Sequence, residues 1–293
     1  MMNIVIVKKG IDIILANTLL KLFQNILSDL EFEYPFFLKW LHKVFDELQI
    51  SEKRIILIYC NTDNIFDIRG IAILKNTLEE RKICTLRVLP PYRHQGIGTI
   101  LLKKSIEILR DPYPLITVSG VHMNLFGPFL RKNGFVLKDK IKSLYRRGCY
   151  EYFYNVPYKH EVAMLSIRPE YVKQIIEGTK KVEFRKKPFS DTVKKVLVYS
   201  SSPQKRIVGY FKVTNVIVDT PIIVWNQYEK VGGIRKEKYD DYYKNSKCAY
   251  AIEIEKFFSF STPLNPQDFD KSFRPPQSFC YVDNVEFLNW LNI

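Results

Sequence analysis

The spacing of apolar residues in the first half of the chain switches between the period of a strand and that of a helix. Helical spacing predicts a helix over 11–30, a break at Tyr34-Pro35, and a second helix up to about Leu48. Further helices are predicted over 96–109 and 126–132. Short apolar runs predict strands over 4–7, 54–60, 68–74, 82–89, 115–118, 135–138 and 143–154, with a hairpin loop over 61–67.

A second pattern begins after residues 156–160, the segment that best fits a linker. A strand over 163–167 leads to a helix that starts at Pro169 and ends before Gly178. Long apolar runs then predict strands over 193–200, 206–218 and 248–258, with helical turns over 222–230 and 239–244. Few short helices among many strands are typical of a small barrel. We therefore expect a mixed α/β (α+β) domain over 1–157 and a β-rich domain over 162–293.

Composition fits two folded domains with a preference for polyanions. The chain has 293 residues, of which 46% are apolar and 26% charged, so it has enough apolar residues for two cores and does not resemble a disordered chain. The formal net charge is +14, and basic residues are densest in 131–147 and 180–187. Such charge favours nucleic acid or phosphate-bearing ligands.

Cysteine and histidine spacing gives no sign of a disulfide framework or of a metal site. The five cysteines are scattered without a Cys-x-x-Cys pair, and the four histidines have no partner at i+4. The sequence also shows no signal peptide and no apolar run of about 18 residues. We therefore expect a protein of a reducing compartment, the cytoplasm, with no metal and no membrane span.

An anion-binding loop is predicted at Arg93-His94-Gln95-Gly96-Ile97-Gly98. A strand ends at Pro90, a tight turn follows, and the glycines open a helix. The first N–H groups of a helix lack intrahelical acceptors, and glycine lets an anion approach the backbone closely. Arg93 and His94 add side-chain donors, so the segment suits a pyrophosphate.

This loop resembles the signature of the GNAT acetyltransferases, Arg/Gln-x-x-Gly-x-Gly/Ala, with Val-x-Pro before it and Ile-Leu-Leu after it. A run that ends in Lys132-Asn133-Gly134-Phe135 resembles a second signature of that family. The resemblance implies acetyl-CoA as co-substrate and a strand that splays from its neighbour to admit the pantetheine arm. It implies main-chain contacts to the arm near Leu86 and Val88, and pyrophosphate held by the amides of about Gln95, Gly96, Ile97, Gly98 and Thr99.

The catalytic residues are less clear than the cofactor loop. Many relatives place a tyrosine, the general acid, where this chain has Leu130. An obvious acidic base is also missing from the motif strand. His122 and Asn124, which follow the next predicted strand, are candidates to face the thioester.

The second half contains Gly178-Thr179-Lys180-Lys181-Val182-Glu183-Phe184-Arg185. In an extended run Lys181, Glu183 and Arg185 share one face, with Lys180 at the bend. A cluster of this kind could grip a phosphate or a base. Spacing alone favours a surface ladder of salt bridges.

The same run resembles the ASCH signature, Gly-x-Lys-x-x-Glu-x-Arg, preceded by Leu-Ser-Ile-Arg-Pro-x-Tyr at 165–171. The resemblance implies a PUA-like β-barrel that binds RNA or other nucleic acid in a cleft lined by Lys180, Glu183, Arg185, Ser278 and Tyr281. Some ASCH proteins are amidohydrolases of N4-acetylcytidine with a threonine nucleophile at the position of Glu183. Glutamate at that position argues against the same activity here.

Three functions fit these motifs. The first is an acetyl-CoA-dependent N-acetyltransferase that transfers acetyl directly to an amine, with an ASCH module that holds an RNA or nucleotide-bearing acceptor. The second is a non-catalytic, acetyl-CoA-responsive regulator that binds nucleic acid, which Leu130 favours. The third is an acetyltransferase of protein lysines or small amines with ASCH as a dimerisation module. The sequence specifies neither the acceptor nor the oligomeric state.

Overall fold

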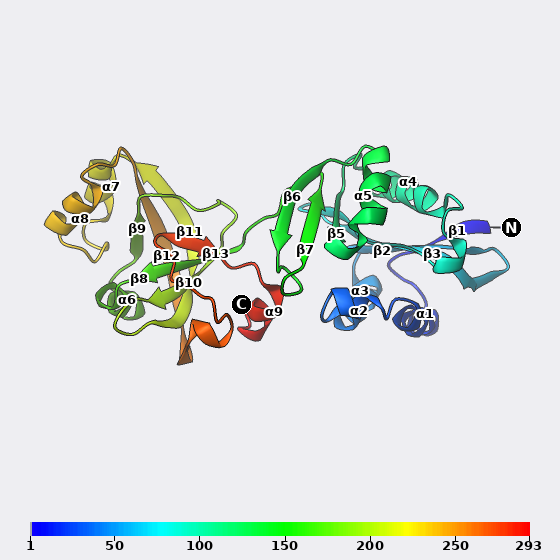
Figure 1. Ribbon diagram of the computed structural model, residues 1–293, viewed down its shortest axis with the longest axis horizontal. Helices are drawn as coiled ribbons and strands as arrows, with labels where there is room; N and C mark the ends of the chain where they lie inside the picture. Colours follow the sequence, from blue (N-terminus) through cyan, green and yellow to red (C-terminus); the bar gives the residue numbers. More distant parts are fainter. Residues whose placement is uncertain (1) are drawn as a thin grey trace. The chain divides into compact units, whose positions relative to one another are not determined.

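The computed structural model describes residues 2–293, which form two compact units (Figure 1). The first unit runs to Tyr158 and includes Asn284–Glu286. The second comprises Lys159–Asp283 and Phe287–Ile293. The predicted fold class, a mixed sheet with flanking helices followed by a β-rich domain, is confirmed.

The first unit is built on one seven-stranded sheet in the order β1-β2-β3-β4-β5-β7-β6. All neighbouring strands are antiparallel except β4 and β5, which are parallel. The strands are β1(Met2–Val7), β2(Arg54–Asn61), β3(Asn64–Asn76), β4(Arg81–Val88), β5(Leu115–Ser119), β6(Leu137–Lys142) and β7(Tyr150–Tyr154).

Helices cover both faces of this sheet (Figure 1). One face carries α1(Ile13–Ile26), α2(Leu30–Glu33) and α3(Phe37–Ile50), and the other carries α4(Ile97–Leu109) and α5(Met123–Lys132). The carboxylate of Asp12 accepts hydrogen bonds from the amides of Ile14 and Leu15, which caps α1. Each helix buries its apolar stripe, so two separate cores lie on opposite sides of the strands.

Several predicted boundaries in this unit are wrong. The helix expected over 11–30 ends at Ile26, and the strand expected over 135–138 is β6, which spans Leu137–Lys142. Strand β3 already begins at Asn64, so the expected loop over 61–67 is a tight turn around Thr62 and Asp63. The expected strand over 143–154 is a loop at 143–149 followed by β7. Ser143 and Gly148 adopt left-handed backbone conformations there, with φ values of 61° and 80°, which strands do not contain.

Strands β4 and β5 pair over two residue pairs and then separate. Lys82 lies beside Leu115 and Ile83 beside Ile116, and no later residue of β4 has a partner on β5. The register between β3 and β4 shifts between the pairs Ile73–Thr85 and Leu74–Ile83, which leaves Cys84 as an extra residue. Such a bulge bends and twists a strand. One edge of β4 is therefore free over residues 84–88.

Close packing at Gly70 holds the start of α4 against the sheet. A Cβ atom at Gly70 would lie 2.9 Å from Leu101 Cδ1, 3.0 Å from Ile97 Cγ2 and 3.2 Å from the carbonyl oxygen of Arg87. Because Ile97 is the first residue of α4, this contact sets the height of the helix N-terminus above β3 and β4.

The second unit is a curled six-stranded sheet in the order β13-β8-β10-β11-β12-β9. Strands β8 and β10 are parallel, and the other neighbours are antiparallel. The strands are β8(Val162–Ile167), β9(Val182–Arg185), β10(Lys195–Ser200), β11(Arg206–Asp219), β12(Ala249–Leu264) and β13(Phe279–Tyr281). Its concave core is a cluster around Leu165, Val196 and Phe211.

Short helices complete this unit. Helix α6(Pro169–Ile176) lies between β8 and β9, while α7(Pro221–Tyr228) and α8(Lys236–Tyr243) lie between the two long strands β11 and β12. The chain ends with α9(Val285–Trp290). No helix within residues 2–293 combines the length and the apolar character needed to cross a bilayer.

We predict that Gly70→Val lowers the free energy of unfolding by about 1–3 kcal/mol, because the branched side chain overpacks the contact with Ile97 and Leu101. Chemical denaturation measures this loss. The control is Gly98→Ala in α4, the helix that packs on Gly70, because its Cβ would meet Phe129 and Val88 at 3.7 Å, an ordinary contact. Equal stability of Gly70→Val and the unaltered protein would show that the helix is not held at this point.

Candidate functional site

The loop between β4 and α4 is exposed and has a strained backbone. A single 3-10 turn, Pro90–Tyr92, follows β4, and residues 93–96 are then exposed. His94 and Gly96 have positive φ values of 64° and 81°. Glycine adopts this conformation without penalty, which explains Gly96 as the residue that precedes the helix.

The N-terminus of α4 presents free amides at this loop. The first helical hydrogen bond runs from the Ile100 amide to the carbonyl of Gly96 at 3.1 Å, so the amides of 97–99 have no intrahelical acceptor. The side chain of Ile97 is buried, and Thr99 is half-buried. Aligned amides at a helix N-terminus favour an anion.

The other predicted cofactor residues surround this point. The side chains of Leu86 and Val88 pack with α4, and their main chain lies on the part of β4 that has left β5. Arg93 and Gln95 turn back to the loop, since Arg93 Nε donates to the Val88 carbonyl and Gln95 Nε2 donates to the Pro91 carbonyl, each at 3.4 Å. The predicted cofactor residues thus lie on one continuous segment, from the end of β4 through the loop to the first turn of α4.

The predicted catalytic candidates are not gathered in this way. His122 ends a 3-10 turn and Asn124 is exposed in the first turn of α5. Neither side chain has a hydrogen-bond partner within residues 2–293. Leu130, at the position of the missing tyrosine, is fully buried in the core with α4. The local structure therefore gives these positions no acid–base partner.

A buried carboxyl that the sequence analysis missed lies near the separation of β4 and β5. Glu151 of β7 pairs with Ser119, the last residue of β5, and is 3% exposed. The Tyr34 hydroxyl lies 3.3 Å from Glu151 Oε1 and accepts a hydrogen bond of 3.1 Å from the Ser119 amide. Ser119 Oγ in turn donates to Glu33 Oε2 at 2.9 Å.

The environment of this carboxyl changes its acidity. Burial raises the pKa of Glu151 to about 7, against the hydrogen bond from Thr117 and the charge of Lys82, which lower it. Burial also raises the pKa of Tyr34 far above neutrality, so its hydroxyl stays protonated. Near pH 7 the pair can therefore hold or release one proton. A carboxyl poised in this range is suited to general base catalysis.

The second unit gathers a compact buried cluster, which we call the Lys–Glu–Arg cluster: Lys180, Glu183 and Arg185. They are 3%, 7% and 8% exposed, respectively. Glu183 lies between the two cations, with Oε1 2.9 Å from Arg185 Nη2 and Oε2 3.4 Å from Lys180 Nζ. The surface ladder favoured by spacing alone is wrong, since it is Lys180 and not the exposed Lys181 that joins Glu183.

The surrounding chain closes over Lys180. Its ammonium group donates to the carbonyl of Gly232, and its Nζ atom lies 5.4 Å above the ring of Tyr171 and 5.2 Å above that of Phe184. Burial lowers the pKa of Lys180, although Glu183 raises it. Gly233 has a positive φ of 66°, and a Cβ there would lie 3.1 Å from Lys180 Cβ, so the closing loop favours glycine at this position.

Arg185 links the two ends of the curled sheet. It lies at the end of β9, one edge, and donates to the Ser278 carbonyl at 3.2 Å and to the Ser166 carbonyl at 2.9 Å. Ser278 immediately precedes β13, the other edge. The guanidinium group thus replaces a strand-to-strand backbone pairing with side-chain hydrogen bonds. Its Nε atom is buried without an acceptor among residues 2–293.

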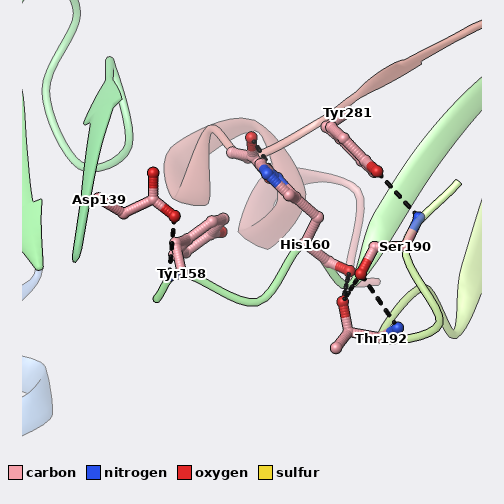
Figure 2. A network of polar contacts seen from close by, with 7 residues as sticks. Asp139, Tyr158, His160, Ser190, Thr192 and Tyr281 are labelled. Atoms are coloured by element: carbon pink, nitrogen blue, oxygen red, sulfur yellow. Dashed lines mark hydrogen bonds and ion pairs between the residues drawn. The ribbon is translucent and has the colours of Figure 1, made fainter. Parts of the chain in front are cut away.

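Tyr281 lies in a different network from the Lys–Glu–Arg cluster. Figure 2 shows its hydroxyl directed at the Ser190 amide, which donates to it at 2.9 Å. Its ring stacks on His160 with centroids 3.7 Å apart, and the carbonyl of His160 accepts from Thr192 Oγ1 at 2.7 Å. Ser278 therefore joins the cluster through its backbone carbonyl, whereas Tyr281 is held by Ser190 and His160.

Two family models match the chain. Residues 20–124 match the acetyltransferase (GNAT) family, and residues 165–258 match the ASCH domain. The chain contains a GNAT acetyltransferase domain and a C-terminal ASCH domain. The GNAT match includes the loop from Arg93 to Gly98, and the ASCH match includes the Lys–Glu–Arg cluster. Within residues 2–293, no three histidine, cysteine or acidic side chains gather as a metal site would require.

Curated relatives and solved structures resemble parts of the chain. It is 29% identical over 123 residues, 42% of its length, to large ribosomal subunit protein uL22 of Ureaplasma parvum, and spans 39% of that protein. It is 25% identical over 139 residues to an ASCH domain-containing ribonuclease of Zymomonas mobilis, covering 45% of this chain and 90% of the relative. The ribosomal-protein-S18-alanine N-acetyltransferase of Escherichia coli matches 53% of this chain and 92% of its own, at 17% identity and a TM-score of 0.39.

We predict that Glu183→Gln destabilises the ASCH domain by about 3–5 kcal/mol, because it leaves two buried cations without their counter-charge. The loss should be larger at pH 5 than at pH 9. The lowered pKa of Lys180 lets this group lose its proton at high pH, which relieves the repulsion. Urea denaturation at both pH values measures the effect.

The matched control is Glu177→Gln, which removes a half-exposed partner of Lys173. It should cost about 0.5 kcal/mol or less, since exposed ion pairs contribute little. Similar losses in the two variants, independent of pH, would contradict a buried, charge-balanced cluster.

Proposed function

We propose that this protein is an acetyl-CoA-dependent N-acetyltransferase that transfers acetyl directly to an amine, with the ASCH domain engaging an RNA or nucleotide-bearing acceptor. One observation carries the proposal: β4 leaves β5 immediately before an exposed loop and the free amides of α4. A free strand edge followed by an anion site suits a ligand that has both an amide-bearing arm and a pyrophosphate.

The chain has the groups that acetyl-CoA requires. The amides of Gln95 to Thr99 and the side chains of Arg93 and His94 would hold the pyrophosphate. The free edge of β4 near Leu86 and Val88 would pair with the amides of the arm. Gly96 leaves open space at the loop, since a Cβ there would meet no heavy atom within 4 Å. When bound, the co-substrate supplies an acetyl thioester.

Glu151 and Tyr34 are the groups that we assign to proton removal. An acceptor that arrives as an ammonium ion must lose a proton before its nitrogen can attack. The Tyr34 oxygen accepts one hydrogen bond from the Ser119 amide and faces Glu151, so it can take a proton from the amine and pass its own to the carboxylate. In this assignment Leu130 is no obstacle, because orientation of the reactants supplies much of the acceleration.

The ASCH domain supports an acceptor related to nucleic acid. Its relative in Zymomonas mobilis is named a ribonuclease, and the chain as a whole has a net charge of +14. The Lys–Glu–Arg cluster has one net positive charge and a guanidinium Nε without an acceptor among residues 2–293. We assign to the cluster, with Ser278 and Tyr281, the binding of a phosphate or a base at the junction of β9 and β13.

A non-catalytic regulator that senses acetyl-CoA and binds nucleic acid is the second candidate, favoured by the burial of Leu130 at the usual general-acid position. Thiol release from acetyl-CoA, measured with an RNA pool and with a panel of amines, separates the possibilities. Release that depends on RNA supports the proposal. Release with simple amines alone indicates a small-amine or protein-lysine enzyme, and coenzyme A binding without release indicates the regulator.

We predict that Gly96→Trp weakens coenzyme A binding at least tenfold in calorimetry, because the indole occupies the open space beside the amides of α4. Its positive φ adds strain of about 1–2 kcal/mol. Gly10→Trp is the matched control, with φ of 83° and no heavy atom within 4 Å of its Cβ. The Gly10→Trp variant should lose a similar amount of free energy of unfolding and keep its affinity for coenzyme A. Equal affinities in the two variants would remove the loop from the cofactor site.

We predict that kcat/KM rises with pH through about 7 in the unaltered protein, because Glu151 accepts a proton only when ionised. Glu151→Gln should lower kcat/KM by about 100-fold or more at pH 8 and flatten this limb of the profile. Tyr34→Phe should lower the rate similarly.

Coenzyme A affinity should stay unchanged in both variants, which separates loss of the base from loss of the fold. An unaltered pH profile in Glu151→Gln would exclude this carboxyl as the base and leave the proposed reaction itself standing.

A further inference from the structure

Strands β11 and β12 form a long antiparallel hairpin in the second unit (Figure 1), and one of their cross-strand pairs is aromatic. Tyr210 and Phe258 face each other in register, and their rings stack with centroids 4.8 Å apart and planes 11° apart. Their chain neighbours Phe211 and Phe257 pair with each other and pack in the concave core. Because side chains alternate along a strand, Tyr210 and Phe258 point away from that core. Both rings are half-buried, and Tyr210 borders a second apolar cluster that contains Leu197 and Tyr199.

Three lysines surround these rings. The Nζ atoms of Lys212 and Lys256 lie 5.6 Å and 5.2 Å from the centroid of Phe258, and that of Lys195 lies 5.9 Å from that of Tyr210. The lysine ion pairs formed among residues 2–293 involve other lysines. Three like charges thus meet on one aromatic surface, and none of these lysines forms a direct ion pair with a carboxylate among residues 2–293.

We propose that this lysine–aromatic face, consisting of Lys195, Tyr210, Lys212, Lys256 and Phe258, binds single-stranded nucleic acid. Bases stack on the rings while the ammonium groups contact backbone phosphates. The inference rests on the nucleic-acid role proposed for the ASCH domain. It adds a surface for the strand that is separate from the buried Lys–Glu–Arg cluster.

The chemistry of the face selects this ligand. Unbalanced lysines require an anion, and phosphodiester chains carry one charge per nucleotide. The rings add a flat apolar surface, which bases match on one strand and cannot match within a duplex, where they are already stacked. An acidic peptide satisfies the lysines and has no regular series of aromatic faces to stack on Tyr210 and Phe258.

The first test measures binding of a fluorescent 12-nucleotide oligouridine to the full-length protein by anisotropy. Phe258→Leu keeps an apolar side chain of similar size and removes the aromatic face, so affinity should fall about 5- to 150-fold. Phe258→Trp should retain binding. Thermal melting of both variants checks that the ASCH domain is intact.

The second test addresses the lysines. A triple variant, Lys195→Ala with Lys212→Ala and Lys256→Ala, should reduce the log–log salt slope by about 2, since each contact to a single strand contributes about 0.7. The control removes three exposed lysines, Lys230, Lys244 and Lys247, from the α7–α8 segment at the other end of the same hairpin. It has the same net charge and should keep most of the slope.

The outcomes separate two failures. If the unaltered protein binds no oligonucleotide, the nucleic-acid role of the ASCH domain fails, and this inference fails with it. If the unaltered protein binds and Phe258→Leu binds equally well, the lysine–aromatic face is wrong and the wider proposal stands. Equal affinity for oligouridine and for an abasic oligomer of the same length would also overturn stacking on these rings.

Discussion

The two residue pairs that join β4 to β5 determine the geometry of the N-terminal unit. Parallel strands cannot be joined by a tight turn, so the chain between them must cross the sheet, which it does through α4. Because β4 and β5 stop pairing after Ile83, the connection through α4 begins where the two strands have already separated. The bulge at Cys84 turns β4 away, and Gly70 lets Ile97 dock where the gap opens. The free strand edge, the exposed loop and the helix N-terminus thus share one structural origin.

The sheet of the ASCH domain also has a gap, between its edge strands β9 and β13, but here a side chain bridges the gap. Its curled sheet ends at β9 and β13, and the guanidinium of Arg185 spans the interval between these edges. A guanidinium can serve several carbonyls at once because its donors point outward in a fixed plane. Glu183 holds that plane in place and balances Lys180 as well. The cluster is therefore part of the architecture before it is part of any binding site, and substitutions in it affect folding and recognition together.

Much of the fold could be predicted from local patterns. The strands and helices of both units follow apolar periodicity, and the predicted cofactor loop is contiguous in the chain, so its residues are neighbours in any fold. The errors lie where the pattern was ambiguous. The polar residues Asn64 and Asp67 suggested a loop, although they extend β3 beyond the core. The aromatic run before Tyr154 suggested one long strand, although Gly148 imposes a left-handed turn.

The residues that sequence reasoning missed are those whose chemistry depends on distant parts of the chain. Glu151 is an unremarkable glutamate in an aromatic strand until Tyr34, 117 positions earlier, covers it and removes water. That burial, and not the identity of the residue, raises its pKa to about 7. The available signal for this residue was the single carboxylate within Tyr-Glu-Tyr-Phe-Tyr. A strand this rich in aromatic residues is expected to be buried, and its glutamate is then buried with it. Isolation of an ionisable residue in an apolar strand marks Glu151, the base that we propose, whereas proximity to the predicted cofactor motif points to His122 and Asn124.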